Sequence, residues 1–234
     1  MRNFFKGMLA AVLALVATVV QAEERVFDVN GFTFISVASG LSARVQIGPE
    51  FSVIAVSESR KDLERLDIWV DGEALMITWE PERGLASLFS SSDPLVVNVT
   101  LPAITGIEGS SGANIHLLAA EVDRFSVTIT SGANAQVEGL LANWVLLNMA
   151  SGANASLAGH CNNFSAVVSS GANLSADQLM CENIEVEARG GGHLSAYAVK
   201  NAVAKAYSGG AVGVYGSPAS FESDESSGGS VRLN

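Results

Sequence analysis

The chain has 234 residues, of which 48% are hydrophobic, and its formal net charge is −11. A chain this acidic repels phosphate backbones, so the composition excludes nucleic acid as a partner. The high apolar content also excludes a disordered chain, and the excess of Ala, Val, Leu and Ile over aromatic residues favours many short, regular strands.

The N-terminal 22 residues have the composition of a secretory signal peptide. Arg2 and Lys6 precede an uncharged apolar stretch, Met8–Val20, and Val20-Gln21-Ala22 offers small residues for cleavage. The stretch is short for a transmembrane span, although an uncleaved anchor is the alternative. We therefore expect an exported chain that begins near Glu23, has no transmembrane span after cleavage, and resides in the periplasm or at the surface of a bacterium.

The segment that follows the predicted signal peptide consists mostly of short strand patterns. Phe32–Val37 is followed by a Ser39-Gly40 turn and by a second strand pattern at 43–47. Apolar residues alternate with other residues in these patterns, as they do in half-buried strands. Further strands are predicted at 51–56 and 95–101.

Between these strands the sequence predicts a helical turn and a hairpin. Residues 59–66 begin with Ser59, a favourable N-cap, and carry Asp62 in the first turn. Two apolar runs then flank Asp71-Gly72, a dipeptide that is typical of two-residue hairpin turns. We expect this hairpin to span residues 68–79.

Residues 81–94 form a predicted long loop bounded by two prolines. The loop carries three large apolar side chains, Leu85, Leu88 and Phe89. Because long loops are often functional, one hypothesis is that these side chains form a partner-contact surface. The alternative is that they fold back over the apolar end of the core.

A four-residue motif, Ser-Gly-Ala-Asn, recurs at a nearly constant spacing in the rest of the chain. Successive copies begin 20, 20 and 19 residues apart. A fixed period of this size indicates a repeat architecture in which each unit stacks on the one before it. The four copies end in Asn114, Asn134, Asn154 and Asn173, and decayed copies follow at 190–193, 208–211 and 227–230.

The residues around each motif indicate how one unit folds. Apolar residues occupy alternate positions before the turn, as at Val127 and Ile129, and after it, as at Val137. Such alternation predicts a strand on each side of the turn, joined to the next unit by a connection, with the apolar residues facing inward. About twenty residues can form one rung of a parallel β-helix, whose neighbouring strands lie about 4.8 Å apart.

We therefore predict an all-β fold, a single-domain parallel β-helix that comprises residues 23–234. Its regular rungs are expected at 104–234. An end of such a solenoid exposes unpaired strand edges and apolar core, so it needs a cap. We expect the irregular region at 26–103 to start the stack or to cap it.

Turn chemistry accounts for each residue of the repeated motif. Gly tolerates positive φ and close approach of backbones, and Ala is small enough for a tight corner. Asn accepts the left-handed conformation, and stacked Asn amides can hydrogen-bond along a ladder. The alternative is that the repeated Ser-Asn line forms a ligand face or orders water. We predict a structural turn ladder of Asn114, Asn134, Asn154 and Asn173.

The two cysteines are predicted to form a disulfide. Cys161 lies three residues before Phe164 and Cys181 three before Ile184, which are equivalent rung positions. The cysteines should therefore stack in neighbouring rungs with their Cα atoms about 5 Å apart, within disulfide range. An oxidising compartment favours the bond. A redox or metal role is the alternative, although no CxxC motif or clustered histidine accompanies the pair.

Five features of the chain together resemble a known family. They are Val37–Gly40, Val45–Ile47, Asp71–Ile77, Val97–Pro102 and the serial Ser-Gly-Ala-Asn rungs. In these features the chain resembles the family of putative auto-transporter adhesin head GIN domains, a bacterial exported group. The resemblance covers about residues 32–234 and implies a β-helical fold at the cell envelope. It supplies no catalytic residues.

The expected function is that of a non-enzymatic, adhesin-like binding or scaffolding module of the cell envelope. Its partner would be an envelope or surface ligand, either a protein or a glycan. The alternative is a carbohydrate-active enzyme, a polysaccharide lyase or hydrolase, because parallel β-helices host many of these.

A catalytic or cation site would need clustered carboxylates on one face. The outward column of Glu187, Lys205 and Asp224 places a cation between two acids, and Glu185 and Glu222 lie beside it. This arrangement favours a charge ladder, with a cation or catalytic site as the alternative. No cofactor or metal is expected, because the three histidines occupy different rung positions.

Overall fold

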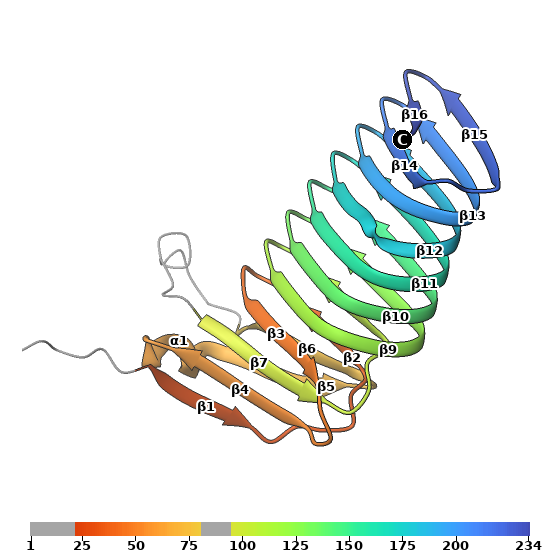
Figure 1. Cartoon of the computed structure of the whole chain (residues 1–234). Helices are drawn as coiled ribbons and strands as arrows, with labels where there is room; N and C mark the ends of the chain where they lie inside the picture. Colours follow the sequence, from red (N-terminus) through yellow and green to blue (C-terminus); the bar gives the residue numbers. More distant parts are fainter. Residues whose placement is uncertain (1–21, 81–94) are drawn as a thin grey trace, which may run out of the picture.

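The computed structural model describes residues 22–80 and 95–234 (Figure 1). Within these residues sixteen strands join in one sheet, and there is a single short helix. Most strands wind around one axis and pair in parallel with the equivalent strand of the next turn, so the predicted parallel β-helix is confirmed.

Five long parallel strands form the regular part of the solenoid. Each strand runs from just after one turn to just before the next and bends in its middle, so that a rung has two arms and no separate connection between them (Figure 1). The sequence predicted two strands and a connection for each unit. The five are β9 (Asn114–Ile129), β10 (Asn134–Met149), β11 (Asn154–Ser169), β12 (Asn173–Arg189) and β13 (His193–Tyr207).

Side chains from both arms fill one continuous core. Leu117 on the first arm of β9 and Val127 on its second arm are both fully buried. The residues between the buried positions point outward, so the two arms present opposite faces of the solenoid. Burial of alternate residues is the reason that the strand pattern could be predicted from the sequence.

The single 19-residue spacing is explained by the bend of β11. The pairing of β10 with β11 shifts by one residue between Val137 and Leu140, so β11 has the shorter bend. Gly159 lies there, and a Cβ at this position would be 2.0 Å from the carbonyl oxygen of Leu140. Only glycine allows so close an approach of two backbones.

The first rung precedes the regular part and uses the same turn. Strands β2 (Phe34–Val37) and β3 (Ser42–Ile47) flank Ser39-Gly40. They pair in parallel with β8 (Gly106–Gly109) and with β9, respectively. The irregular region thus starts the stack, as predicted.

The same region also closes this end of the solenoid. Two strands pair in parallel with the outer edge of the first rung, β6 with β2 and β7 with β3. Three further strands then add in antiparallel orientation, β5 to β6, β4 to β7 and β1 to β4. The bounds are β1 (Glu23–Phe27), β4 (Ser52–Ser57), β5 (Leu66–Asp71), β6 (Ala74–Trp79) and β7 (Leu95–Leu101).

The predicted helical turn lies between β4 and β5. Helix α1 (Arg60–Arg65) begins after Ser59, whose Oγ accepts a hydrogen bond from the Asp62 amide at 3.3 Å. Leu63 is 3% exposed and joins the core. The hairpin β5–β6 turns at Asp71-Gly72, also as predicted.

Three short strands end the solenoid at the C-terminal side. Strand β14 (Ala211–Gly216) pairs with β13, β15 (Ser220–Ser226) pairs with β13, and β16 (Ser230–Leu233) pairs with β14. The apolar alternation of the repeats predicts that Leu233 faces inward. It is 50% exposed, because it belongs to the last rung that the structure describes.

Two sequence predictions lie outside the described residues. Residues 1–21 hold almost all of the predicted signal peptide, and residues 81–94 hold the predicted contact loop with Leu85, Leu88 and Phe89. In the part of the chain that is described, no helix has the length and apolar character needed to cross a membrane.

Candidate ligand-binding face

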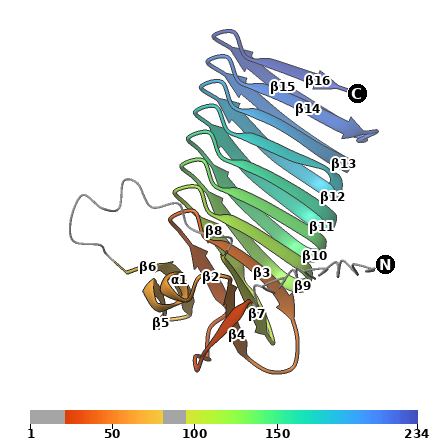
Figure 2. The same cartoon turned by 90° about the vertical axis from the view of Figure 1, so that its left-hand side faces the viewer.

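Each Ser-Gly pair forms a type I′ turn, in which both central residues have positive φ. In the turn before β10, φ is 53° at Ser131 and 72° at Gly132, and the Ala133 amide donates to the Thr130 carbonyl oxygen at 3.1 Å. The turns lie in a row along one edge of the solenoid (Figure 2). The serines with this conformation are Ser39, Ser111, Ser131, Ser151, Ser170, Ser208 and Ser227.

The expected left-handed conformation of the Asn residues was wrong. Asn134 is the first residue of β10 and follows the turn, whereas the serine and the glycine supply both positive φ angles. A type I′ turn needs exactly these two central positions to be left-handed, so the motif places Asn beyond it. Ala133 points inward and is fully buried, which leaves the Asn side chain facing solvent.

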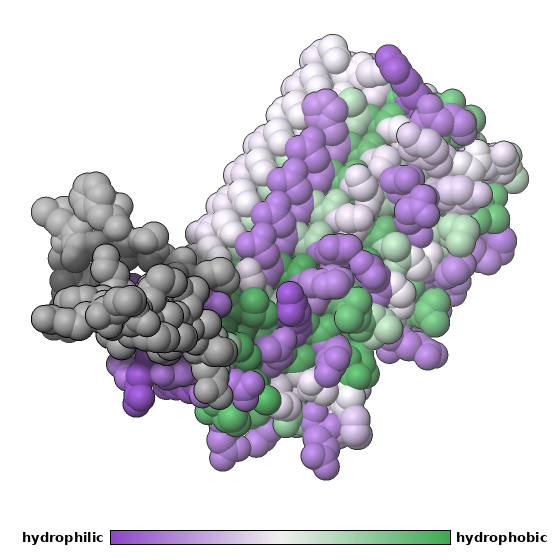
Figure 3. All heavy atoms as spheres, turned by 60° about the vertical axis from the view of Figure 1, so that its left-hand side comes forward, coloured by the Kyte–Doolittle hydropathy of each residue, from purple (hydrophilic) through white to green (hydrophobic). Residues whose placement is uncertain are grey.

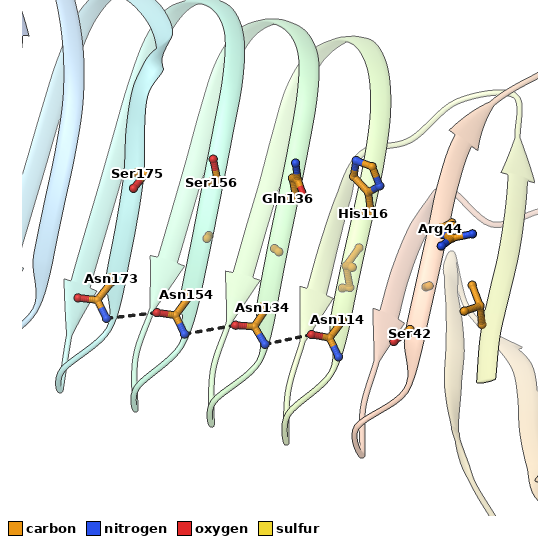
Figure 4. Close-up of a pocket in the computed structure, with 15 residues that line it drawn as sticks. Ser42, Arg44, Asn114, His116, Asn134, Gln136, Asn154, Ser156, Asn173 and Ser175 are labelled. Carbon is orange, nitrogen blue, oxygen red and sulfur yellow. Dashed lines mark hydrogen bonds between the residues drawn. The ribbon is translucent and has the colours of Figure 1, made fainter. Parts of the chain in front are cut away.

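The Asn side chains form a hydrogen-bonded ladder across four rungs (Figure 4). The Nδ2 of Asn134 donates to the Oδ1 of Asn114 at 3.0 Å, and Asn154 and Asn173 donate in the same way at 3.2 Å each. All donate toward the N-terminal end. A polar stripe consequently runs along the solenoid beside the small turn residues (Figure 3).

A second outward column lies two residues after the Asn column. It contains His116, Gln136, Ser156 and Ser175, one from each rung, and Arg44 holds the equivalent position in the first rung (Figure 4). The residues between the columns, such as Ala135, point inward. The first arms therefore present two parallel rows of polar side chains.

The two columns line a shallow groove of about 570 Å³. Its lining residues include no Asp or Glu, although the chain has 24 of them, and the one formally charged lining group is Arg44. Glu138 lies at the border, where its Oε1 accepts from Gln136 at 2.6 Å and is 3.4 Å from the Nε2 of His116. The groove is thus a nearly neutral strip on an acidic chain.

Much of the hydrogen-bonding capacity in this groove faces solvent. Within the described residues, the hydroxyls of Ser156 and Ser175 have no hydrogen-bond partner in the protein. The amide groups of three Asn residues donate along the ladder, and those of Asn114, Asn154 and Asn173 donate to the carbonyl of their own turn glycine at 3.4–3.5 Å. Each Asn Oδ1 keeps a second lone pair. The groove therefore offers repeated acceptors beside repeated hydroxyls.

The predicted acidic column lies on the second arm and is held in pairs. Glu187, Lys205 and Asp224 do align in register, but Lys205 Nζ contacts Glu185 Oε1 at 3.0 Å. This hydrogen bond raises the pKa of Lys205 above its ordinary value. Tyr207 donates to Asp224 at 2.7 Å, and that bond raises the pKa of Tyr207. In these two pairs each carboxylate is engaged by a neighbouring side chain, so the pairs do not present a free carboxylic acid beside a free base, as a catalytic site would need.

Sequence reasoning missed two further amide ladders at the bend. Asn143 donates to Asp123 at 2.7 Å and Asn162 donates to Asn143 at 2.8 Å. The second ladder joins three Asn side chains at 3.1 and 2.7 Å. These ladders could have been predicted from the sequence, because their Asn residues recur at intervals of nearly 20 residues. The repeats were aligned only on the serines of the motif, so this second spacing was overlooked. The second ladder comprises Asn163, Asn183 and Asn201.

The disulfide lies beside these ladders, and its Cys161 lines a second groove of about 770 Å³. Cys161 and Cys181 are bonded with their Cα atoms 4.4 Å apart, so the predicted disulfide is confirmed. Both cysteines are buried. Among residues 22–80 and 95–234, no group of three or more His, Cys, Asp or Glu side chains is arranged to hold a metal ion.

A capped parallel β-solenoid with a long polar groove defines a class of protein built to present a rigid surface. The family described as "Putative auto-transporter adhesin, head GIN domain" matches residues 31–218. The chain belongs to this family, which makes it an adhesin-like module. No curated protein matches the sequence significantly.

Solved structures share the fold at low sequence identity. A structure named as a putative adhesin from Bacteroides fragilis has a TM-score of 0.82 at 13% identity, covering 92% of this chain and 97% of its own. A putative adhesin from Parabacteroides distasonis has a TM-score of 0.67 at 13% identity, with 92% and 97% covered. A putative lipid binding protein from the same species has 0.68 at 14%, with 91% and 97% covered.

Proposed function

We propose that this protein is an exported, non-enzymatic module of the bacterial cell envelope that binds an extended ligand along the groove of its first arms. The observation that carries the proposal is the groove with its two rows of polar side chains, without Asp or Glu among its lining residues, on a chain with a net charge of −11. A rigid row of identical groups suits a repetitive ligand better than a small molecule.

Export is supported by two independent features. The N-terminal residues combine a positive start, an apolar stretch and a small-residue cleavage site. The Cys161–Cys181 disulfide is typical of proteins that fold in an oxidising compartment. Relatives in fold are named as adhesins and, in one case, as a lipid binding protein, and both names are compatible with a role at the envelope.

A non-enzymatic role is supported by the distribution of carboxylates. The groove has none among its lining residues, and on the opposite arm Lys205 engages Glu185 while Tyr207 engages Asp224. Glycoside cleavage normally uses two carboxyl groups that face one sugar. The contact loop around Leu88 and Phe89 stays a hypothesis for a second binding surface.

Binding of labelled protein to isolated envelope fragments tests the proposal. In the blocked variant, Ser156→Tyr with Ser175→Tyr, two exposed groove positions carry rings that fill the groove. The control variant, Asn148→Tyr with Val167→Tyr, places the same rings on the opposite arm. We expect the blocked variant to lose most envelope binding and the control to retain it. Equal binding by both variants would contradict a role for the groove.

A further inference from the structure

We propose that the ligand of the groove is a linear, neutral, β-1,4-linked polysaccharide that lies parallel to the solenoid axis. This inference rests on the proposed function, since it names the chemical class that the groove would take. Three properties of the groove carry it: its repeat distance, its hydrogen-bonding groups and its charge.

The repeat distance favours a sugar chain over a peptide. Equivalent groove residues of successive rungs, such as Asn134 and Asn154, lie one strand spacing apart, which is about 4.8 Å. An extended peptide advances only about 3.3 Å per residue, so its groups fall out of step with the rungs. A pyranose unit in an extended β-1,4 chain is close to one rung spacing in length, so successive sugars lie beside successive rungs, each next to one residue of either column.

A peptide also lacks a backbone edge to pair with in this groove. The strands that form its floor are paired on both sides, as β10 is with β9 and β11. Strand addition, the usual way in which a sheet binds an extended peptide, needs a free edge. The groove therefore offers side chains alone.

The hydrogen-bonding groups match hydroxyls. Along one side the Asn Oδ1 atoms are acceptors, and along the other Ser156 and Ser175 can both donate and accept. Each sugar carries several hydroxyls that can donate to the amide oxygens and exchange bonds with the serines. At the N-terminal end of the groove, Arg44 has no ion-pair or hydrogen-bond partner within the described residues, and its guanidinium offers several donors to a terminal sugar.

The charge of the groove and its border favours a neutral chain. The lining residues contribute one positive charge, from Arg44. Two acids, Glu138 and Asp177, follow the second-column residues of their strands by two positions and so lie at the border of the groove. A polysaccharide with a carboxylate on every sugar would meet these acids and the net charge of −11. A neutral polysaccharide meets no such repulsion.

The length of the groove sets a length dependence. Five rungs line it, from Ser42 through Asn114, Asn134 and Asn154 to Asn173. Four strand spacings correspond to about 19 Å. At one sugar per rung, a hexasaccharide covers the whole groove and a trisaccharide covers three of its five rungs. The lining contains no Phe, Tyr or Trp ring on which a sugar could stack, so affinity should build up over many sugars.

Isothermal titration with β-1,4-linked hexasaccharides of glucose, mannose and N-acetylglucosamine tests the proposal. At least one should bind, about tenfold or more tightly than its trisaccharide, which corresponds to 1.4 kcal/mol. The blocked variant should lose this binding about tenfold or more, and the control variant should stay within about twofold of the unmodified protein. A β-1,4-linked glucuronic acid hexamer, with a carboxylate on every sugar, should bind more weakly than the neutral hexasaccharide that binds best.

The outcomes separate this inference from the proposed function. If no neutral hexasaccharide binds although the blocked variant still loses envelope binding, the ligand class is wrong and the groove remains a binding site. If a hexasaccharide binds the blocked variant as well as the unmodified protein, the placement in the groove is wrong. If the glucuronic acid hexamer binds most tightly, the charge argument is wrong. Thermal unfolding of both variants checks that they are folded.

Discussion

Both ends of the solenoid would expose unpaired strand edges and apolar core, but the two ends are protected in different ways. At the N-terminal end, five strands and helix α1 add layers over the first rung, and they bury large residues such as Phe32 and Leu63. At the C-terminal end, β15 continues the inward columns above Ala204 and Ala206 with Ser223 and Glu225. An exposed end of a solenoid can thus be covered by additional strands and a helix, or its inward positions can carry polar residues in place of apolar ones.

The core itself changes between these ends. The second arm of β9 contributes Phe125, Val127 and Ile129, whereas the equivalent positions of β13 are all alanine. Less apolar surface is buried per rung toward the C-terminus, and burial is the main source of stability. The N-terminal half should therefore be the more stable part, and four experiments can break or sharpen this comparison.

The largest difference is expected for one phenylalanine at each end. Phe32 is fully buried and its ring centroid lies 4.9 Å from that of Phe51, whereas Phe221 is 37% exposed. Phe32→Ala should lower the free energy of unfolding by about 3–5 kcal/mol, as large core truncations do, and Phe221→Ala by less than about 1 kcal/mol. Chemical denaturation measures both changes. Equal losses would contradict the claim that the N-terminal end contributes more stability than the C-terminal end.

Removal of the disulfide should have the next largest effect. Cys161→Ala with Cys181→Ala opens a loop whose ends are 20 residues apart, which should cost about 3 kcal/mol in the chain-entropy model. We expect the loss to fall on the alanine-rich rungs that follow, because they have the smallest core. Hydrogen exchange should show faster opening of β13–β16 than of β3 and β7. A uniform increase along the chain would refute this difference.

The helix cap at the N-terminal end should contribute a smaller amount. Ser59→Ala removes the side chain that accepts from the Asp62 amide, and the free energy of unfolding should fall by about 1 kcal/mol. Ser59→Asp, which keeps a capping oxygen, is the matched control and should retain most of the stability. Thermal or urea unfolding measures both. No loss in the alanine variant would mean that α1 is not part of the stabilising cap.

The smallest effect on stability is expected at the C-terminal end. Glu225 accepts a hydrogen bond from the Val231 amide at 2.8 Å at an exposed site, so Glu225→Val should cost only about 0.5 kcal/mol. It also removes an inward charge from an edge strand, and we expect new self-association that rises with protein concentration. Sedimentation velocity measures this, with Glu225→Gln as the control that keeps a polar side chain. Unchanged association of the valine variant would show that the edge is protected in another way.

The regular part of the fold was predictable because the spacing of the repeated motif determines which residues of neighbouring rungs pair. The spacing of the motif placed Cys161 beside Cys181 and aligned the Asn residues, since every rung repeats the same contacts. The conformation of the motif was harder to predict. Serine is a less common choice than Asn for a left-handed position, so Asn was assigned the role that Ser131 and its equivalents have.

The caps and the groove could be predicted only in part. Short strands were expected at 51–56 and 95–101, but their antiparallel pairing depends on contacts between distant segments that no local pattern encodes. The groove emerged only when the polar residues two places after each Asn, such as Ser156, were seen as a column. These residues vary in type from rung to rung, so the repeat alone does not single them out.

The 20-residue register between β9 and β10 also means that the length of the solenoid can change in fixed steps. Strands β9 and β10 pair with an offset of 20 residues throughout, so one inserted or deleted unit of that length would keep every contact and change only the number of rungs. The reach of the protein would then grow or shrink in fixed steps of one strand spacing. Relatives with more or fewer turns would measure out correspondingly longer or shorter stretches of the same kind of partner.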